Sequence, residues 1–312
     1  MTEILIVSTH SETGAASTTQ KRAVRLAKFC VRHHFKIMKS ETINNNPDIG
    51  LPPPVWTRLQ FEARAAAADE PTMASYIGAA ILSHETLCSA LSFHLAEKLA
   101  GPEMGAQQVR QIISAAYAEF PDLLIAAEQD IQATLERDPA CRGVLQPFLF
   151  FKGFLALQTY RVANTLWRQG RETLAFQFQS RASEKFAVDI HPATQIGQGV
   201  MLDHATDITI GETAVIGDNC SIMQGVTLGG TGKETRDRHP KLGNGVLISV
   251  GAKVLGNIRI GDEAKVAAGS VVLKDVAPKC TVAGVPAKQV GGPSSAPARN
   301  MDQALPDAGA ET

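Results

Sequence analysis

No aromatic residue occurs after Phe186, so all of the Phe, Trp and Tyr side chains lie in the first part of the chain. Glycine is distributed the other way, since 18 of the 26 glycines lie after residue 190. A core in the second part must therefore be built from aliphatic side chains alone, whereas rings are available to the first part. We expect two different architectures to share the 312 residues.

Long apolar runs and an excess of either charge are also lacking. The longest apolar stretch, residues 144–157, is interrupted by Pro147 and Lys152 and falls short of the roughly 20 residues that span a bilayer. Lys and Arg number 30 against 31 Asp and Glu, which gives a net charge of -1. We therefore expect no membrane association and no nucleic-acid binding driven by overall charge.

The cysteines are few, far apart and without a Cys-x-x-Cys pair. They are Cys30, Cys88, Cys141, Cys220 and Cys280. This spacing argues against a disulfide framework or a thiolate zinc site and favours buried free thiols in a reducing compartment. We expect a cytoplasmic protein.

The N-terminal part lacks the basic region and apolar core of a secretory signal. Residues 21–39 are basic and contain no acidic side chain, a composition shared by transit peptides and by loosely ordered extensions. The second interpretation is the simpler one, and Met38 is an alternative start. Because residues 40–54 are polar and end in three prolines, we assign 1–54 to a poorly ordered extension and linker.

Residues 55–186 have the apolar periodicity of helices. One such stripe, with steps of three and four residues, contains Ile77, Ile81, His84, Leu87, Leu91, Leu95 and Leu99. Gly101-Pro102, Pro121-Asp122 and Asp138-Pro139 separate the helical stretches. These patterns predict an all-α domain over 55–186, with the stripes forming its core.

Beyond residue 190 the aliphatic residues recur at steps of six. Three series follow this step: Ile190, Ile196, Leu202 and Ile208; then Ile210, Ile216, Ile222 and Leu228; then Leu242, Ile248, Val254, Ile260, Val266 and Val272. A small or β-branched residue stands four positions after most of them. This is the hexapeptide signature of a left-handed parallel β-helix, in which each coil buries its aliphatic face only against neighbouring coils. We predict an α+β chain with this β-helix over 187–290 and a disordered tail over 291–312.

Histidines are unusual in such repeats, and the predicted β-helix contains only His191, His204 and His239. With about eighteen residues per coil, Asp189 and His204 are expected to face each other on adjacent coils. A carboxylate bonded to one imidazole nitrogen raises the basicity of the other, which suits a general base acting on a hydroxyl or amine. A purely structural histidine at a coil corner explains the same residue. A zinc site of three histidines is the less favoured alternative, because their spacing is irregular, and we expect no metal.

A charged, glycine-rich segment interrupts the repeats between Leu228 and Leu242. Arg238 and His239 lie in it beside several lysines and arginines, a composition suited to binding a carboxylate. A solvated surface loop is the alternative interpretation. Inserted segments of repeat proteins often carry their function.

Several segments resemble the serine O-acetyltransferase family, and the resemblance runs from about Val55 to Val290, roughly three-quarters of the chain. They include KGFLALQTYRVANTLWRQGR (152–171), VDIHPATQIGQGVMLDHATDITIGETAVIGD (188–218) and VTLGGTGKETRDRHPKLGNGV (226–246). The resemblance implies acetyl transfer from acetyl-CoA, as co-substrate, to the hydroxyl of L-serine.

By matching motif, the resemblance assigns His204 as the general base and Asp189 as the residue that orients it. It assigns Asp203 to the substrate amino group, and Arg238 with His239 to its carboxylate. Asp138 matches a family residue that reaches the serine site from a neighbouring subunit.

The same resemblance implies that Gly230, Thr231, Lys265 and Ala268 contact acetyl-CoA along the β-helix between adjacent subunits. It further implies a homotrimer or a dimer of trimers, and inhibition by L-cysteine at the serine site. The sequence departs from the family at residues 249–252, where Ser-Val-Gly-Ala replaces a Gly-Ala-Gly-Ala run. Members that dock into O-acetylserine sulfhydrylase end in isoleucine, whereas this chain ends in Thr312, which argues against that complex.

Two other functions fit the same fold. Another hexapeptide-repeat acetyltransferase, acting on a sugar, would share the base but would not need Asp203 or the Arg238-His239 pair. A non-enzymatic or metal-binding β-helix would show no turnover of acetyl-CoA, or would lose its activity on chelation.

Overall fold

The computed structural model describes residues 53–232, 235–292 and 295–305. They belong to one compact unit that begins at Pro52. The predictions for residues 1–52 lie outside the described residues.

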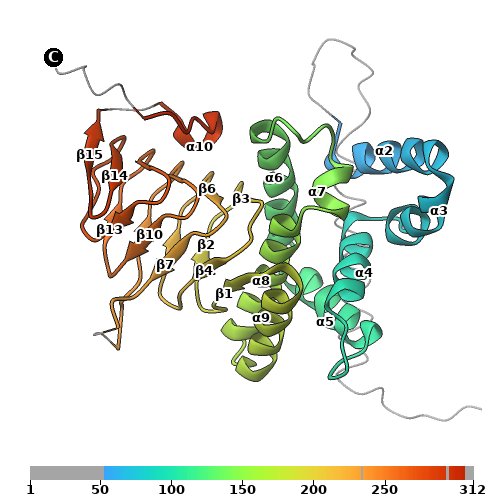
Figure 1. Cartoon of the computed structure of the whole chain (residues 1–312). Helices are drawn as coiled ribbons and strands as arrows, with labels where there is room; N and C mark the ends of the chain where they lie inside the picture. The colour runs from blue at the N-terminus through green and yellow to red at the C-terminus, as the bar shows by residue number, and fades with distance from the viewer. Residues whose placement is uncertain (1–52, 233–234, 293–294, 306–312) are drawn as a thin grey trace, which may run out of the picture. The chain divides into compact units, whose positions relative to one another are not determined.

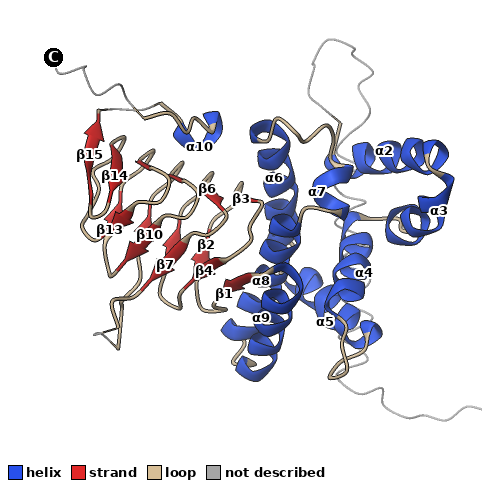
Figure 2. Cartoon of the chain, in the orientation of Figure 1, coloured by secondary structure: helices blue, strands red, loops and turns tan. Residues whose placement is uncertain are grey.

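The first part of this unit is built from helices (Figures 1 and 2). They are α2 (Val55–Asp69), α3 (Pro71–Ile77), the π-helical turn η1 (Gly78–Leu82), α4 (Leu87–Leu99), α5 (Ala106–Glu119), α6 (Asp122–Arg137), α7 (Leu145–Leu149), α8 (Lys152–Arg168) and α9 (Glu172–Phe186). Local signals set their ends. The hydroxyl of Thr86 accepts a hydrogen bond from the Ser89 N–H at 3.2 Å and caps α4, while α9 ends at Ala187 in the left-handed region, φ 54°.

The second part is a left-handed parallel β-helix with three sheets. One sheet has the order β1 (Val188–Ile190), β4 (Ile208–Ile210), β7 (Thr227–Gly229), β10 (Lys253–Leu255), β13 (Val271–Val272). The second has β2 (Gln195–Ile196), β5 (Val215–Ile216), β8 (Lys241–Leu242), β11 (Arg259–Ile260). The third has β3 (Met201–Asp203), β6 (Ser221–Met223), β9 (Leu247–Ile248), β12 (Lys265–Val266), β14 (Thr281–Gly284), β15 (Ala287–Gly291). We call these sheets A, B and C; each coil passes through them in that order.

The predicted six-residue repeat forms the interior of this prism. Ile210 pairs with Leu228, Leu228 with Val254, and Val254 with Val272, so that a buried aliphatic column follows sheet A. Residues on either side of each column member point outward, as the alternation of strands requires. The prediction of a helical domain followed by a left-handed β-helix of hexapeptide repeats is confirmed.

A buried ion pair joins the helices to the β-helix. Arg161 on α8 donates to Asp130 on α6, with the Nη2–Oδ2 distance 2.8 Å, and its guanidinium also bonds the Gly197 carbonyl oxygen at 2.7 Å. The other Asp130 oxygen accepts from the Val200 N–H at 2.9 Å, directly before β3. The two architectures therefore share one continuous core.

Part of the C-terminal tail lies on sheet C. Helix α10 (Pro297–Asn300) places the Ala298 carbonyl oxygen 2.8 Å from the Ser221 hydroxyl, which donates to it. Arg299 forms an ion pair of 3.2 Å with Glu136 of α6. Main-chain acceptors and Arg299 thus give residues 295–305 contacts that composition does not reveal.

Candidate active site

The His204 side chain lies at the corner between sheets C and A. It follows β3 directly, and both His204 and Ala205 have left-handed backbone conformations, with φ of 51° and 59°. Such conformations cost about 1–2 kcal/mol per non-glycine residue. The imidazole is 74% exposed, while Ala205 is fully buried and anchors the turn. This strained corner holds the histidine outward, where a substrate can reach it.

Helix α8 begins against the same corner. A Cβ at Gly153 would lie 2.0 Å from the Leu202 carbonyl oxygen, so only glycine allows the first turn of α8 to approach β3 this closely. The neighbouring Lys152 ammonium donates to the Thr206 hydroxyl. The helical domain thus supports the turn that carries His204.

Two carboxylates accompany His204. Its Nε2 lies 3.8 Å from Asp203 Oδ1, and the Asp203 side chain is 13% exposed. Burial raises the pKa of Asp203, and the Asp138 carboxylate raises it further, opposed by His204. Asp138 ends α6 in the same chain, so its charge acts on Asp203 without a neighbouring subunit. The assignment of Asp138 to a neighbouring subunit stays a prediction, and within one chain α6 packs beside β3.

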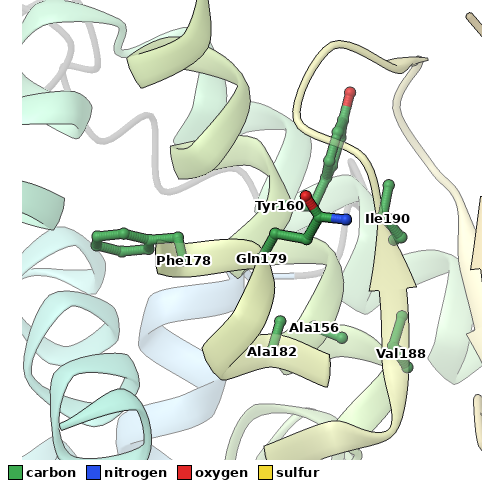
Figure 3. A pocket seen from close by; sticks show the side chains of 7 residues that line it. All are labelled: Ala156, Tyr160, Phe178, Gln179, Ala182, Val188 and Ile190. Atoms are coloured by element: carbon green, nitrogen blue, oxygen red, sulfur yellow. The ribbon is translucent and has the colours of Figure 1, made fainter. Parts of the chain in front are cut away.

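Asp189, the predicted orienting residue, has a different partner. Gln179 extends from α9 toward β1 (Figure 3), and its Nε2 donates to Asp189 Oδ1 at 2.6 Å. Asp189 is in register with Thr209, five residues beyond His204. Within the described residues no hydrogen bond or ion pair joins Asp189 to His204.

Arg238 and His239 lie at the corner between sheets A and B. Arg238 Nη2 donates to Glu212 Oε2 at 2.6 Å. The His239 ring packs where a Cβ of Gly211 would stand, 2.0 Å from Nε2, which explains the glycine at that position. Burial lowers the pKa of His239, and the Arg238 and Lys241 charges lower it further.

The residues predicted to contact acetyl-CoA lie on later coils. Gly230 packs against Arg238, and Thr231 lies beside Gly256 of the next coil. Ala268 is exposed in the turn after β12. Lys265 is 5% exposed in its side chain because the tail covers it: its ammonium donates to the Ala304 carbonyl oxygen and lies 4.0 Å from Asp302 Oδ2.

The two groups of predicted serine ligands are therefore separated in one chain. His204 and Asp203 occupy the corner before β4, and Arg238 with His239 the corner after β7. Sheet A lies between these corners, and the five residue-to-residue steps from 206 to 211 span on the order of 15 Å when extended. A ligand the size of an amino acid cannot reach both corners of one chain.

Several contacts in this region have no counterpart in the sequence prediction. They involve Lys152, Gly153, Gln179, Glu212 and Thr213. Among the described residues, no group of three or more His, Cys, Asp or Glu side chains is arranged to hold a metal ion. None of the helices in the described ranges has the length and apolar character required to cross a membrane.

Two family models match the chain. The model described as serine acetyltransferase, N-terminal, matches residues 55–159, and the model described as bacterial transferase hexapeptide matches 239–274. A serine acetyltransferase of Salmonella typhimurium is 54% identical over 250 residues, which cover 80% of this chain and 92% of the relative.

Solved structures with ligands are similar as well. A serine acetyltransferase in complex with cysteine aligns with a TM-score of 0.79 at 50% identity, over 80% of this chain and 98% of the other. The Brucella abortus serine acetyltransferase in complex with coenzyme A aligns with a TM-score of 0.77 at 46% identity, over 78% of this chain and 97% of the other. The soybean serine acetyltransferase complexed with serine aligns with a TM-score of 0.75 at 52% identity, over 76% of this chain and 97% of the other.

Proposed function

This chain belongs to the serine acetyltransferase family, and we propose that it transfers the acetyl group of acetyl-CoA to the hydroxyl of L-serine with His204 as the general base. The products are O-acetyl-L-serine and CoA, in the first committed step from serine to L-cysteine. The observation that carries the proposed role of His204 is its exposed imidazole, held outward on a left-handed backbone beside the Asp203 carboxylate.

The proposed reaction has one base and no covalent enzyme intermediate. His204 takes the proton of the serine hydroxyl as its oxygen attacks the thioester carbonyl carbon. When the tetrahedral intermediate collapses, the C–S bond breaks and the imidazolium returns the proton to the CoA thiolate. Cys141 and Cys220 are buried thiols whose pKa is raised chiefly by burial, which makes them poor nucleophiles. Positioning of the two substrates then contributes much of the rate.

Serine is held through its two charges in this proposal. Asp203, supported by Asp138, binds the ammonium, and Arg238 with His239 binds the carboxylate. The polarity of the two corners supports this assignment, because one presents carboxylates and the other a guanidinium beside an imidazole. Asp189 is proposed to orient His204 when substrate is bound, with Gln179 fixing its Oδ1.

The separation of the two corners supports an active site built from two copies of the chain. We propose a homotrimer, or a dimer of trimers, in which the sheet C–A corner of one copy faces the sheet A–B corner of the next. Acetyl-CoA is proposed to lie between the copies along Gly230, Thr231, Lys265 and Ala268. Because the tail covers Lys265 here, the tail must move before that ammonium reaches a phosphate.

Inhibition and location are proposed on chemical grounds. L-cysteine carries the same ammonium and carboxylate as L-serine, so the same two corners would hold it as a feedback inhibitor. Complex formation with O-acetylserine sulfhydrylase is not proposed. A cytoplasmic location is proposed, and the free thiols of Cys141 and Cys220 support it.

Thiol release from acetyl-CoA tests the proposed activity directly. We expect CoA release that depends on L-serine and that no sugar or amino sugar reproduces. If a panel of sugars releases as much CoA as L-serine does, the chain is an acetyltransferase with another acceptor. If no acceptor releases CoA, the β-helix is not catalytic.

Replacing Arg238 by alanine tests the carboxylate contact. We expect the serine KM to rise roughly 100-fold, since a charge-assisted bidentate contact is lost, and the acetyl-CoA KM to change little. Equal effects on the KM values for L-serine and acetyl-CoA would contradict a role of Arg238 in serine binding.

A further inference from the structure

We propose that Thr213 is a positioning residue for the substrate carboxylate, because its hydroxyl holds the backbone of Arg238 and His239 and its own backbone N–H fixes the tautomer of the His239 ring. The inference rests on the proposed function and extends it to a residue that touches no substrate.

The Thr213 hydroxyl has contacts for its full hydrogen-bonding capacity. Its oxygen accepts from the Arg238 N–H at 3.0 Å and from the His239 N–H at 3.1 Å. The same oxygen lies 2.9 Å from His239 Nδ1, and the Asp237 carboxylate also interacts with this hydroxyl. One side chain therefore organises two consecutive residues of the inserted segment.

These contacts determine which ring nitrogen of His239 carries the proton. The Thr213 N–H also points at His239 Nδ1, at 3.2 Å, and a backbone N–H can only donate. Nδ1 must then be an acceptor, which places the proton on Nε2. Within the described residues Nε2 has no hydrogen-bond partner, and it lies beside Gly211, where no side chain covers it. The ring thus presents an N–H donor suited to a carboxylate oxygen.

Neighbouring groups complete the arrangement. Glu212 precedes Thr213 and holds the Arg238 guanidinium, while the Lys241 ammonium bonds the Thr213 and His239 carbonyl oxygens. The aliphatic stem of Arg238 packs toward Gly230. Thr213 is the one residue of this group that contacts the backbone of both proposed serine ligands, so removing its hydroxyl disturbs both.

The test compares Thr213→Val, which keeps the shape and loses the hydroxyl, with Thr213→Ser, which keeps the hydroxyl. We expect the valine variant to bind L-serine roughly tenfold to hundredfold more weakly, because the backbone N–H groups of Arg238 and His239 lose their acceptor. The serine variant should stay within about threefold of the wild type. Thr173→Val, at an exposed position of α9, is the matched control and should have no effect.

L-serinamide separates positioning from a general structural effect, because a neutral amide replaces its carboxylate. We expect Thr213→Val to reduce the preference for L-serine over L-serinamide, with the acetyl-CoA KM unchanged. An unchanged preference, or a serine variant as impaired as the valine variant, would overturn the proposal. Binding of both ligands is measured by calorimetry, and turnover is measured separately. Absence of serine turnover would contradict the proposed function, while the binding data would still test the role of Thr213.

A measurement on the unmodified chain covers the case in which the valine variant does not fold. Nitrogen chemical shifts of ¹⁵N-histidine-labelled protein report the tautomer of each ring, with His239→Gln used for assignment. We expect a protonated Nε2 and an unprotonated Nδ1 at His239. A protonated Nδ1 would overturn the proposal.

Discussion

Replacing Asp130 by alanine is expected to destabilise the joint between the helical domain and the β-helix. The carboxylate accepts hydrogen bonds from Gln158, Arg161 and the Val200 N–H, and its side chain is 1% exposed. Its removal leaves the Arg161 guanidinium, 6% exposed, without a counter-charge. The first β-helix coil loses a main-chain contact next to β3, the strand that leads to His204.

The expected loss of stability depends on the burial of the ion pair rather than on the number of its contacts. Breaking a buried pair by removing one partner costs about 3–5 kcal/mol, because the remaining charge stays desolvated. For a domain of this size about 1 kcal/mol corresponds to a change in Tm of roughly 2–4 °C. A fall in Tm on the order of 6–20 °C is expected.

Thermal unfolding followed by circular dichroism, at fixed protein concentration, measures the effect. The double variant Asp130→Ala with Arg161→Met removes both charges and should lose less stability than the sum of the two single variants. Asp122→Asn on the exposed first turn of α6 is the control, with an expected cost below about 1 kcal/mol. A loss below about 1 kcal/mol for Asp130→Ala, the range of exposed pairs, would refute the argument from burial.

Two further predictions concern the His204 corner. Gly153→Ala forces the Leu202 carbonyl to move, and a shift of about 1 Å near the reacting groups can lower the rate on the order of 100-fold. We therefore expect kcat for thiol release to fall while the fold persists. An unchanged kcat would show that α8 does not position this turn. L-serine binding should weaken as the pH falls through the raised pKa of Asp203, since the protonated acid no longer attracts the ammonium. Asp138→Asn removes a charge that raises the pKa of Asp203. In calorimetric titrations of this variant, L-serine binding should therefore be lost at a lower pH than in the wild type. Loss of binding at an unchanged pH would contradict the proximity of the two carboxylates.

The architecture was predictable because its signals are periodic. A step of six among aliphatic residues specifies a coil, and the absence of rings after Phe186 fits a prism too narrow for them. Helix boundaries at Val55 and Phe186 follow from local composition in the same way. The ordered part of the tail, by contrast, depends on single contacts such as Ser221 with Ala298, which leave no periodic pattern.

The candidate site was predictable only in part. His204, Arg238 and His239 stand out as unusual residues in a repeat, but Gln179 and Gly153 act through the packing of α8 and α9 on the β-helix, which periodicity does not encode.

Thr213 was accessible from the register of the coils. Val215 pairs with Lys241 on the next coil. Thr213 lies two positions before Val215, and His239 lies two positions before Lys241. Finding it required counting through the insertion, after which the two residues stand on adjacent coils. The left-handed backbone of His204 and Ala205 has no such signal, because neither position carries the glycine that usually marks that conformation.

The central claim is that His204 is the general base, and His204→Ala tests it most directly. Serine-dependent CoA release should fall about 100- to 10,000-fold in kcat, while the KM values for L-serine and acetyl-CoA change little and the circular dichroism spectrum is retained. A variant that keeps kcat within about tenfold of the wild type would contradict the account, since removal of a base should cost at least about 100-fold.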